Sequence, residues 1–191
     1  MSESYLDRNL GEFLDMVAQR RTAPGGGVVA ALTVSAAAGL VAMTARYSVG
    51  RMEGSEELVD DAERLRARAA ALADADAHAY GAVIAAYASA RDDEQVGSER
   101  VHAALTRAAQ VPLEVAEIGS EIARLAGRLA AEGKRDVRGD AVTAVLLAEA
   151  ATRSAAHLVA VNVEAGGGDA ELVRRASGSM AAARDAAARV E

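Results

Sequence analysis

The sequence predicts an all-α protein, a bundle of five to six long, alanine-rich helices with one helix kinked at a proline. Apolar residues recur at three- and four-residue spacing, and no stretch alternates in the manner of a half-buried strand. Alanine dominates, whereas the chain has one Phe, four Tyr and no Trp. Small side chains let helices approach closely, so we expect tight packing. A length of 191 residues is compatible with a single domain, residues 1–191, that buries a core.

The first helix is predicted over residues 4–19 and is followed by a glycine loop. The apolar residues that recur there at helical spacing are Leu6, Leu10, Phe13, Leu14 and Val17. Pro24 cannot lie inside a helix, so the chain must leave the first helix before it. Gly25, Gly26 and Gly27 follow directly.

The second helix is predicted from Val28 to about Val49, with Gly50 as its end. The segment Ala23–Ala45 carries no charge and is long enough to cross a bilayer. Its three consecutive glycines and its hydroxyl side chains argue against a membrane span. We interpret it as the central helix of a soluble bundle, buried on almost all sides, and expect no membrane association.

The third and fourth helices are predicted over residues 55–90 and 98–131, joined by a polar turn over residues 91–97. Ser55, followed by two glutamates, is typical of a helix start and is expected to cap the third helix. Pro112 interrupts the fourth helix. Because proline removes a backbone hydrogen bond and clashes with the preceding turn, a kink is predicted near Val111.

The last two helices are separated by the triple glycine at residues 166–168. The fifth is predicted over about 139–164, after the charged stretch 133–140. Asp169 is expected to cap the sixth, an amphipathic helix that runs to the end of the chain.

Composition narrows the functional classes. The net charge is −7 and no basic stretch stands out, which argues against nucleic-acid binding. The absence of cysteine excludes disulfides and thiolate metal sites and is compatible with the cytosol, so we expect a cytoplasmic protein. Asp74 and His78 have the spacing of a helical metal pair, but two ligands are too few. An exposed ion pair is expected there instead, and no metal site is predicted.

The glycine loop is the first candidate binding element. Free N–H groups in the first turn of the second helix would point into the loop and suit an anion or a polar ring. A flexible connection between two helices is the simpler interpretation of the same residues.

Two helices carry further candidates. Asp76, Tyr80 and Tyr87 share one helix face, which is typical of a polar stripe lining a pocket or of core tyrosines with a wet hydroxyl. Asp140 stands at the start of an apolar helix, either as a general acid/base or as a first-turn acid favoured by the helix dipole. Asn162 lies within the same apolar helix, where its amide must bond another helix or a ligand.

With these residues assembled, the chain resembles the cyclodeaminase/cyclohydrolase family, which comprises the C-terminal domain of formiminotransferase-cyclodeaminase and stand-alone methenyltetrahydrofolate cyclohydrolases. The similarity extends over nearly the whole chain and depends on the order and spacing of short elements. These are residues 13–15, 23–27 with 30–32, Met43 with Thr44 and Gly50, 76–80, 108–114, Gly133, Asp140 and 159–162.

The resemblance implies an all-helical homodimer that binds a folate without metal. It further implies a one-carbon enzyme, methenyltetrahydrofolate cyclohydrolase or formimidoyltetrahydrofolate cyclodeaminase, with a tetrahydrofolate derivative as substrate and no cofactor. Both reactions need proton transfers that one positioned carboxylate can supply, and Asp140 is the catalytic candidate. The substrate-binding candidates are Pro24, Gly25, Gly26, Gly27, Asp76, Tyr80, Lys134, Arg135 and Asn162, with Lys134 or Arg135 holding the glutamate tail.

Four positions depart from the family pattern. Val28 and Gly139 stand where the family usually has Ser, and Lys134 and Leu158 stand where it usually has Asn. Because polar groups are exchanged, two alternatives stay open: a non-catalytic folate-binding paralogue, and a helical dimerisation protein without a small ligand.

The lengths of the predicted helices lead to two further expectations. Small residues on long helices bury little area in one thin subunit, so a second copy is expected to complete the core. Asp140 and Asn162 are 22 positions apart, since 162 − 140 = 22, which on one straight helix separates them by roughly 33 Å. One small reacting group therefore cannot contact both within one subunit, and we expect Asn162 to be structural or to act in a different pocket.

Overall fold

The computed structural model describes residues 4–90, 94–166 and 168–190, and every regular element in those residues is a helix. This confirms the all-α prediction. Six α-helices and two short 3-10 helices follow one another in the order η1 Tyr5–Asp7, α1 Leu10–Ala18, α2 Gly26–Ser48, α3 Ser55–Ser89, α4 Glu94–Glu132, η2 Arg135–Val137, α5 Arg138–Gly166 and α6 Ala170–Ala188.

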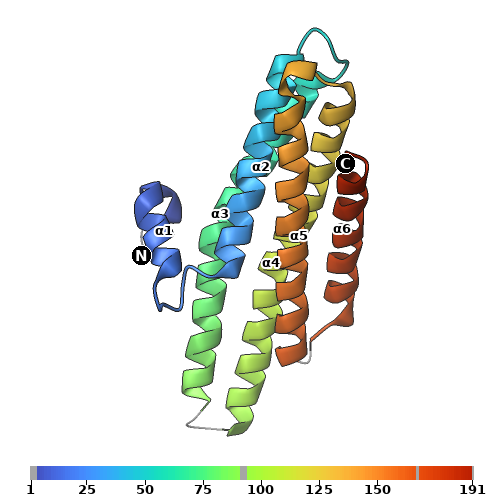
Figure 1. The fold of residues 1–191 in the computed structure, drawn as a ribbon. Helices are drawn as coiled ribbons and strands as arrows, with labels where there is room; N and C mark the ends of the chain where they lie inside the picture. The colour runs from blue at the N-terminus through green and yellow to red at the C-terminus, as the bar shows by residue number, and fades with distance from the viewer. Residues whose placement is uncertain (1–3, 91–93, 167, 191) are drawn as a thin grey trace.

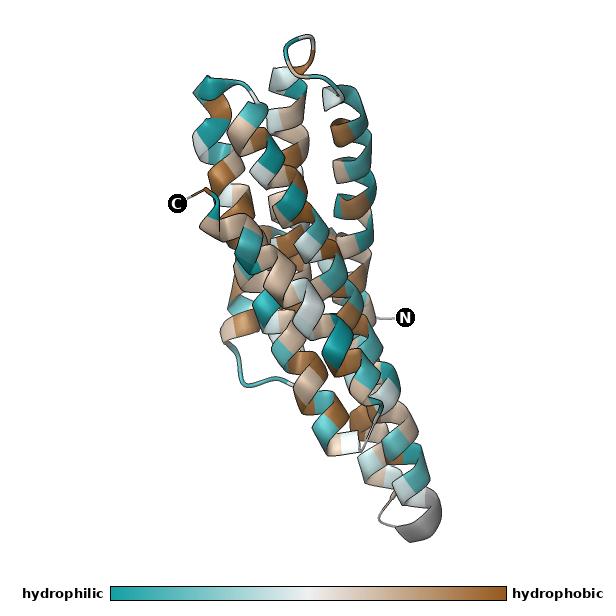
Figure 2. Ribbon diagram, turned by 90° about the vertical axis from the view of Figure 1, so that its right-hand side faces the viewer, coloured by the Kyte–Doolittle hydropathy of each residue, from teal (hydrophilic) through white to brown (hydrophobic). Residues whose placement is uncertain are grey.

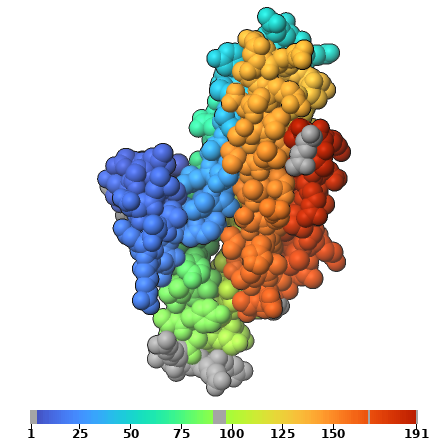
Figure 3. Space-filling view, in the orientation of Figure 1, coloured from blue at the N-terminus to red at the C-terminus, as the bar shows by residue number. Residues whose placement is uncertain are grey.

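The helices α2 to α5 form an elongated up-and-down bundle (Figure 1). α2 packs against α3, α4 and α5, while α6 packs against α4 and α5. α1 lies to one side of the bundle, beside α2 and α3, and stands out from its surface (Figure 3). The glycine loop and the last turns of α5 share one level of the bundle, and the start of α5 lies at the opposite end (Figure 1).

Small residues let the helices approach closely. Ala31, Ala37 and Ala38 of α2 are completely buried. A side chain at Gly119 of α4 would overlap the hydroxyl of the buried Thr152 on α5, so these two helices cross almost backbone to backbone. Each buried CH₂ contributes about 0.8 kcal/mol. The stability of such a core therefore comes from many small contacts.

The N-terminal helix differs from its prediction. The expected single helix over residues 4–19 is divided into η1 and α1, because the extended Arg8 and Asn9 lie between them. Asn9 then caps α1, its side chain accepting a hydrogen bond from the N–H of Glu12. Asn9 is a favoured cap residue, so this break had a sequence signal that the apolar spacing concealed.

The ends of α2, α3 and α6 depend on turn residues. Gly50 has φ +75°, as expected of a residue that ends a helix, and α2 stops at Ser48. The cap of α3 is Gly54, with φ +73°, and the predicted cap Ser55 is the buried first residue of that helix. Asp169 caps α6 as predicted, accepting from the N–H of Glu171.

α4 begins at Glu94, earlier than the predicted Ser98, and continues through Pro112. The kink near Val111 stays a prediction. Residues 91–93 of the predicted polar turn lie outside the described part of the chain.

The central helix α2 is not buried on all sides within one subunit. Its buried residues face α3, α4 and α5, but Val29 is 37% exposed and Tyr47 54% exposed. The prediction of burial on almost all sides is therefore wrong for the single subunit, since one face of α2 lies open.

Two stretches, Gly26–Ser48 and Arg135–Gly166, have the length and composition of a membrane span. In Gly26–Ser48, 56% of the most apolar window is buried inside the bundle, and a buried core helix has the same length and composition as a membrane span. Hydrophilic and hydrophobic residues are interspersed along the helices, without a continuous apolar belt in this view (Figure 2).

Candidate functional site

The glycine loop leads directly into the N-terminus of α2. Gly25 is the N-cap in an extended conformation, and no side chain bonds to the first N–H groups of the helix from that position. Pro24 is buried just before it. The first turn of α2 therefore presents backbone donors that no N-cap side chain satisfies.

Asp76 of α3 fills the space that the glycine leaves open. A Cβ atom at Gly27 would overlap all three carboxyl atoms of Asp76, so only glycine permits this contact. The N–H of Val28 donates a hydrogen bond to the Asp76 carboxyl group. Burial raises the pKa of Asp76 above its ordinary value, and the hydrogen bond from Val28 opposes this in part.

A pocket of about 300 Å³ opens beside this carboxyl group. Its walls come from the glycine loop and from α3, α4 and α5. They comprise Thr22, Ala23, Gly25, Gly26, Gly27, Asp76, Ala77, Ala79, Tyr80, Ala108, Leu158, Val161 and Asn162. We call this the glycine-loop pocket.

Two further polar side chains line the pocket. Tyr80 lies one turn after Asp76 on α3 and is 46% exposed. Asn162 of α5 donates from Nδ2 to the carbonyl oxygen of Ala108 on α4, at 3.2 Å. This bond fixes the Asn162 amide at the pocket wall and joins the two helices. Of the two roles weighed for Asn162, the bond to another helix is present, and a bond to a ligand stays a prediction.

The structure thus brings together six of the ten predicted site residues: Gly25, Gly26, Gly27, Asp76, Tyr80 and Asn162. Pro24 lines an adjoining groove on the α1 side, together with Val17, Val29 and Thr33. The pocket residues that the sequence analysis missed are small or apolar. Leu158 had a usable signal, since it precedes Asn162 by four positions and therefore shares its helix face.

The remaining three predicted residues lie at the opposite end of the bundle. Asp140 is exposed in the first turn of α5. Lys134 forms an ion pair with Asp136 at 3.2 Å, and its Nζ lies 5.4 Å from the ring centroid of Tyr47. Arg135 is exposed in η2.

The expected separation of Asp140 and Asn162 is met, because α5 is one continuous helix over Arg138–Gly166. Their distance along it is roughly 33 Å at 1.5 Å per residue. Within one subunit Asp140, Lys134 and Arg135 therefore do not reach the glycine-loop pocket.

The N-terminal arm is fastened next to the pocket. Asp74, two residues before Asp76, accepts hydrogen bonds from the hydroxyl of Ser4 and from the N–H of Tyr5 at 2.9 Å. The predicted ion pair between Asp74 and His78 is replaced by this attachment. Burial raises the pKa of Tyr5, whose ring also packs edge-on against Phe13.

Among residues 4–90, 94–166 and 168–190, no three acidic or histidine side chains converge in a way that could hold a metal ion. The chemistry available at the glycine-loop pocket is that of one carboxyl group with a raised pKa, an aromatic hydroxyl, an amide and backbone N–H donors.

Known proteins are similar to this chain in sequence and in fold. The sequence model of the formiminotransferase-cyclodeaminase family matches residues 9–182. The chain is 32% identical over 161 residues to the methenyltetrahydrofolate cyclohydrolase of Methylorubrum extorquens, covering 80% of this chain and 77% of that protein. The crystal structure of formiminotetrahydrofolate cyclodeaminase from Thermotoga maritima has the same fold. The TM-score is 0.84 at 24% identity, over 97% of this chain and 94% of that one.

Proposed function

This chain belongs to the formiminotransferase-cyclodeaminase family of folate enzymes, and from that premise we propose that it is a methenyltetrahydrofolate cyclohydrolase acting at the glycine-loop pocket. The curated relative with 32% identity carries that activity in its name, which favours hydrolysis over ammonia elimination. The observation that carries the proposal is the Asp76 carboxyl group, held against Gly27 beside an open pocket with a raised pKa.

The reaction needs a group that first takes a proton and then returns it. Water attacks the methenyl carbon between N5 and N10 of the cationic substrate, and the Asp76 carboxylate accepts a proton from the attacking water. The C–N5 bond then breaks as Asp76 returns that proton to N5, while the hydroxyl of the tetrahedral adduct releases its own proton to solvent and becomes the formyl C=O. The product is 10-formyltetrahydrofolate, with the net release of one proton. A carboxyl group whose pKa is raised towards the working pH suits both steps.

The other pocket residues would position the substrate. A volume of about 300 Å³ is at the small end of ligand sites and suits a ring system with the rest of the molecule outside. The N–H groups of Gly26 and Gly27, which no N-cap side chain satisfies, suit a carbonyl or ring nitrogen of a pterin. Tyr80, half exposed at the mouth, offers an aromatic face to a ring that leaves the pocket.

Two of the four departures from the family pattern fall at this pocket. The side chain of Val28 is completely buried and the bond to Asp76 comes from its backbone N–H, so valine in place of serine keeps that contact. Leu158, in contrast, places an apolar side chain in the pocket wall where the family usually has Asn. The alternative of a folate-binding paralogue without turnover rests on that exchange.

We further infer that the enzyme is a homodimer formed through one face of α2 and α5. On both helices, half-buried or exposed residues recur with alternating spacings of four and three, as in a coiled-coil seam. We call these residues the α2–α5 face: Val29, Thr33, Ala36, Leu40, Met43 and Tyr47, with Thr143, Leu147, Ala150, Ser154, His157 and Val161. α2 and α5 pack side by side, and Val29 and Thr33 of α2 line one groove together with Ala150 and Ser154 of α5, so the two stripes adjoin. Figure 3 shows both helices on the side of the molecule that faces the viewer.

A two-fold dimer through the α2–α5 face gives Asp140 a role. Ala151 lies midway between Asp140 and Asn162 and near the middle of the α5 stripe. A two-fold axis perpendicular to the helices at that level exchanges the two ends of the bundle. Asp140, Lys134 and Arg135 of the partner subunit would then approach the glycine-loop pocket, and the basic residues could hold the glutamate tail of the substrate.

A folate-binding titration followed by turnover assays tests the proposed function. The wild-type protein should open 5,10-methenyltetrahydrofolate faster than it releases ammonia from the formimidoyl substrate. The reverse preference would make it a cyclodeaminase. Binding without either turnover would select the non-catalytic paralogue, and absence of both would select a dimerisation protein.

A further inference from the structure

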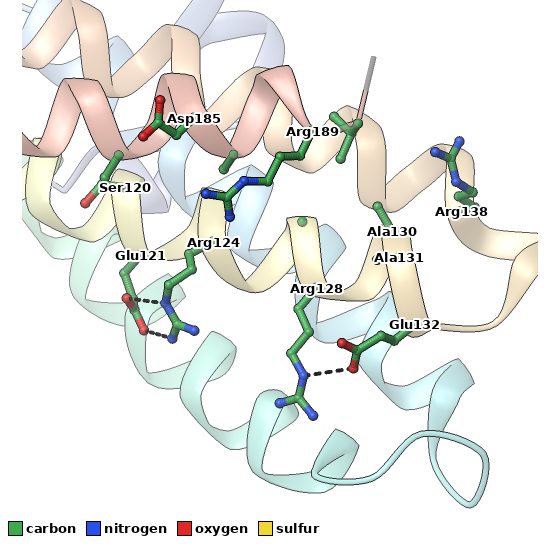
Figure 4. Close-up of a pocket in the computed structure, with 14 residues that line it drawn as sticks. Ser120, Glu121, Arg124, Arg128, Ala130, Ala131, Glu132, Arg138, Asp185 and Arg189 are labelled. Carbon is green, nitrogen blue, oxygen red and sulfur yellow. Dashed lines mark hydrogen bonds and ion pairs between the residues drawn. The ribbon is translucent and has the colours of Figure 1, made fainter.

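A second concave site lies at the other end of the bundle, between the last four turns of α4 and the end of α6. It is a groove of about 530 Å³ that shares no residue with the glycine-loop pocket. We call it the α4–α6 groove (Figure 4). Its lining combines small residues, among them Gly127, Ala130, Ala182 and Ala186, which we call its floor, with charged residues, which we call its rim.

Part of the charge on the rim is already paired. Arg124 donates two hydrogen bonds to Glu121, and Arg128 donates to Glu132 at 3.2 Å and to the carbonyl oxygen of Glu53 at 2.7 Å. The charges of these two arginines and two glutamates therefore cancel in pairs, as the dashed lines in Figure 4 indicate.

The other charged groups of the rim are two arginines and one aspartate. In the described part of the chain, the guanidinium groups of Arg138 and Arg189 make no hydrogen bond or ion pair, and neither does the carboxylate of Asp185. The groove thus keeps one surplus positive charge, whereas the chain as a whole carries −7.

The side chain of Arg189 points into the groove (Figure 4). Asp185 precedes it by four residues, the spacing at which an aspartate and an arginine on one helix commonly pair. Instead, the Arg189 side chain leaves α6 and extends toward the stretch of α4 that carries Arg124 and Arg128 (Figure 4). A free guanidinium group over a floor of small residues offers both charge and directed donors to a ligand.

We propose that the α4–α6 groove binds a small polyanion, a molecule with two or more carboxylate or phosphate groups, separately from the folate site. The planar guanidinium group of Arg189 matches the oxygens of a carboxylate or phosphate group with paired hydrogen bonds, and Arg138, at the α5 end of the groove, adds a second positive charge (Figure 4). A short carbon or phosphate backbone fits the floor of alanine and glycine. The free Asp185 carboxylate on α6 repels negative charge. The anionic groups of the ligand therefore lie away from Asp185, toward α4 and the start of α5.

Isothermal titration of the full chain at low ionic strength tests this proposal, with citrate as the tricarboxylate and pyrophosphate as the phosphate probe. The variants are Arg189→Gln and Arg138→Gln. The matched control is Arg184→Gln, since Arg184 is an exposed arginine of α6 that does not line the groove. Circular dichroism verifies that each variant is folded.

We expect at least one probe to bind, with affinity lowered roughly fivefold by Arg189→Gln or Arg138→Gln and less than twofold by Arg184→Gln. Tighter citrate binding identifies a carboxylate site and tighter pyrophosphate binding a phosphate site. The proposal is overturned if neither probe binds below about 10 mM, or if Arg184→Gln weakens binding as much as Arg189→Gln, which indicates only general attraction of anions.

Discussion

The contact between Gly27 and Asp76 can be tested with a single added methyl group. In Gly27→Ala the new Cβ atom would overlap the Asp76 carboxyl group. Because an aspartate side chain can rotate away, the main loss is the hydrogen bond that the N–H of Val28 donates to that carboxyl group. Such a bond to a charged group is worth about 1.5–3 kcal/mol.

The higher helix propensity of alanine offsets part of this loss of stability. Alanine is a better helix former than glycine, by up to about 1 kcal/mol in a helix interior. We therefore expect Gly27→Ala to lower the free energy of unfolding by about 0.5–3 kcal/mol. Urea denaturation at one fixed protein concentration measures this difference, and the fixed concentration removes any effect of subunit association.

The neighbouring glycine supplies a matched control. At Gly26 the nearest atom to an added Cβ would be Cδ1 of Leu158 at 4.0 Å, an ordinary contact. Gly26→Ala should therefore leave the stability unchanged or raise it slightly. The same substitution one residue apart thus separates the loss of the Asp76 contact from a general effect of alanine in the loop.

A double-mutant cycle assigns the loss to Asp76. In an Asp76→Ala background the carboxyl group is gone, so adding Gly27→Ala should cost nothing and should stabilise the protein by up to about 1 kcal/mol. The coupling energy should therefore equal the loss of the hydrogen bond alone, about 1.5–3 kcal/mol. Equal stability of the Gly27→Ala and Gly26→Ala variants, or a coupling energy near zero, would refute the contact and the proposed catalytic role built on it.

Three further predictions follow from the site and the α2–α5 face. Asp76→Asn should lower turnover by about 10²- to 10⁴-fold with little change in folate binding. Asp140→Asn should lower turnover only if the partner subunit supplies Asp140 to the pocket. A wild-type rate in Asp76→Asn would exclude Asp76 from the mechanism. The folded-state pKa of Asp76 lies above the ordinary 3.8, so the folded protein holds this proton more tightly than the unfolded chain. Stability relative to Asp76→Asn should therefore fall as pH rises from below 3.8 through the raised pKa, and a difference that is flat or rises in urea titrations at several pH values would contradict this. Sedimentation should detect a wild-type dimer, and Ala150→Arg should convert that dimer to a monomer. The control Ala71→Arg, at an exposed alanine of α3 outside the α2–α5 face, should leave the dimer intact. A wild-type monomer at micromolar concentration would exclude the interface.

The sequence by itself determined the helical class and most helix ends, because those depend on local chemistry. The 3.6-residue spacing of apolar side chains, the proline and glycines at residues 24–27, Gly50 and Asp169 act within one or two turns of the chain. The same local information also indicated that Asp76 and Tyr80 share a helix face. It placed the α3 cap one residue too late at Ser55, since boundaries depend on backbone angles such as the positive φ of Gly54.

Only the tertiary structure decided which helix faces meet. Helical spacing defines a face but not its partner, and Gly27 meets Asp76 only because α2 and α3 pack at one particular register. The choice of Asp140 as the catalytic candidate rested on its place at the head of an apolar helix, a local criterion. The length of α5 then separates Asp140 from the glycine-loop pocket by roughly 33 Å, a distance that sequence spacing yields only once the helix is known to be continuous. The raised pKa of Asp76 likewise arises from burial by side chains far away in the sequence, and no window of local sequence contains that information.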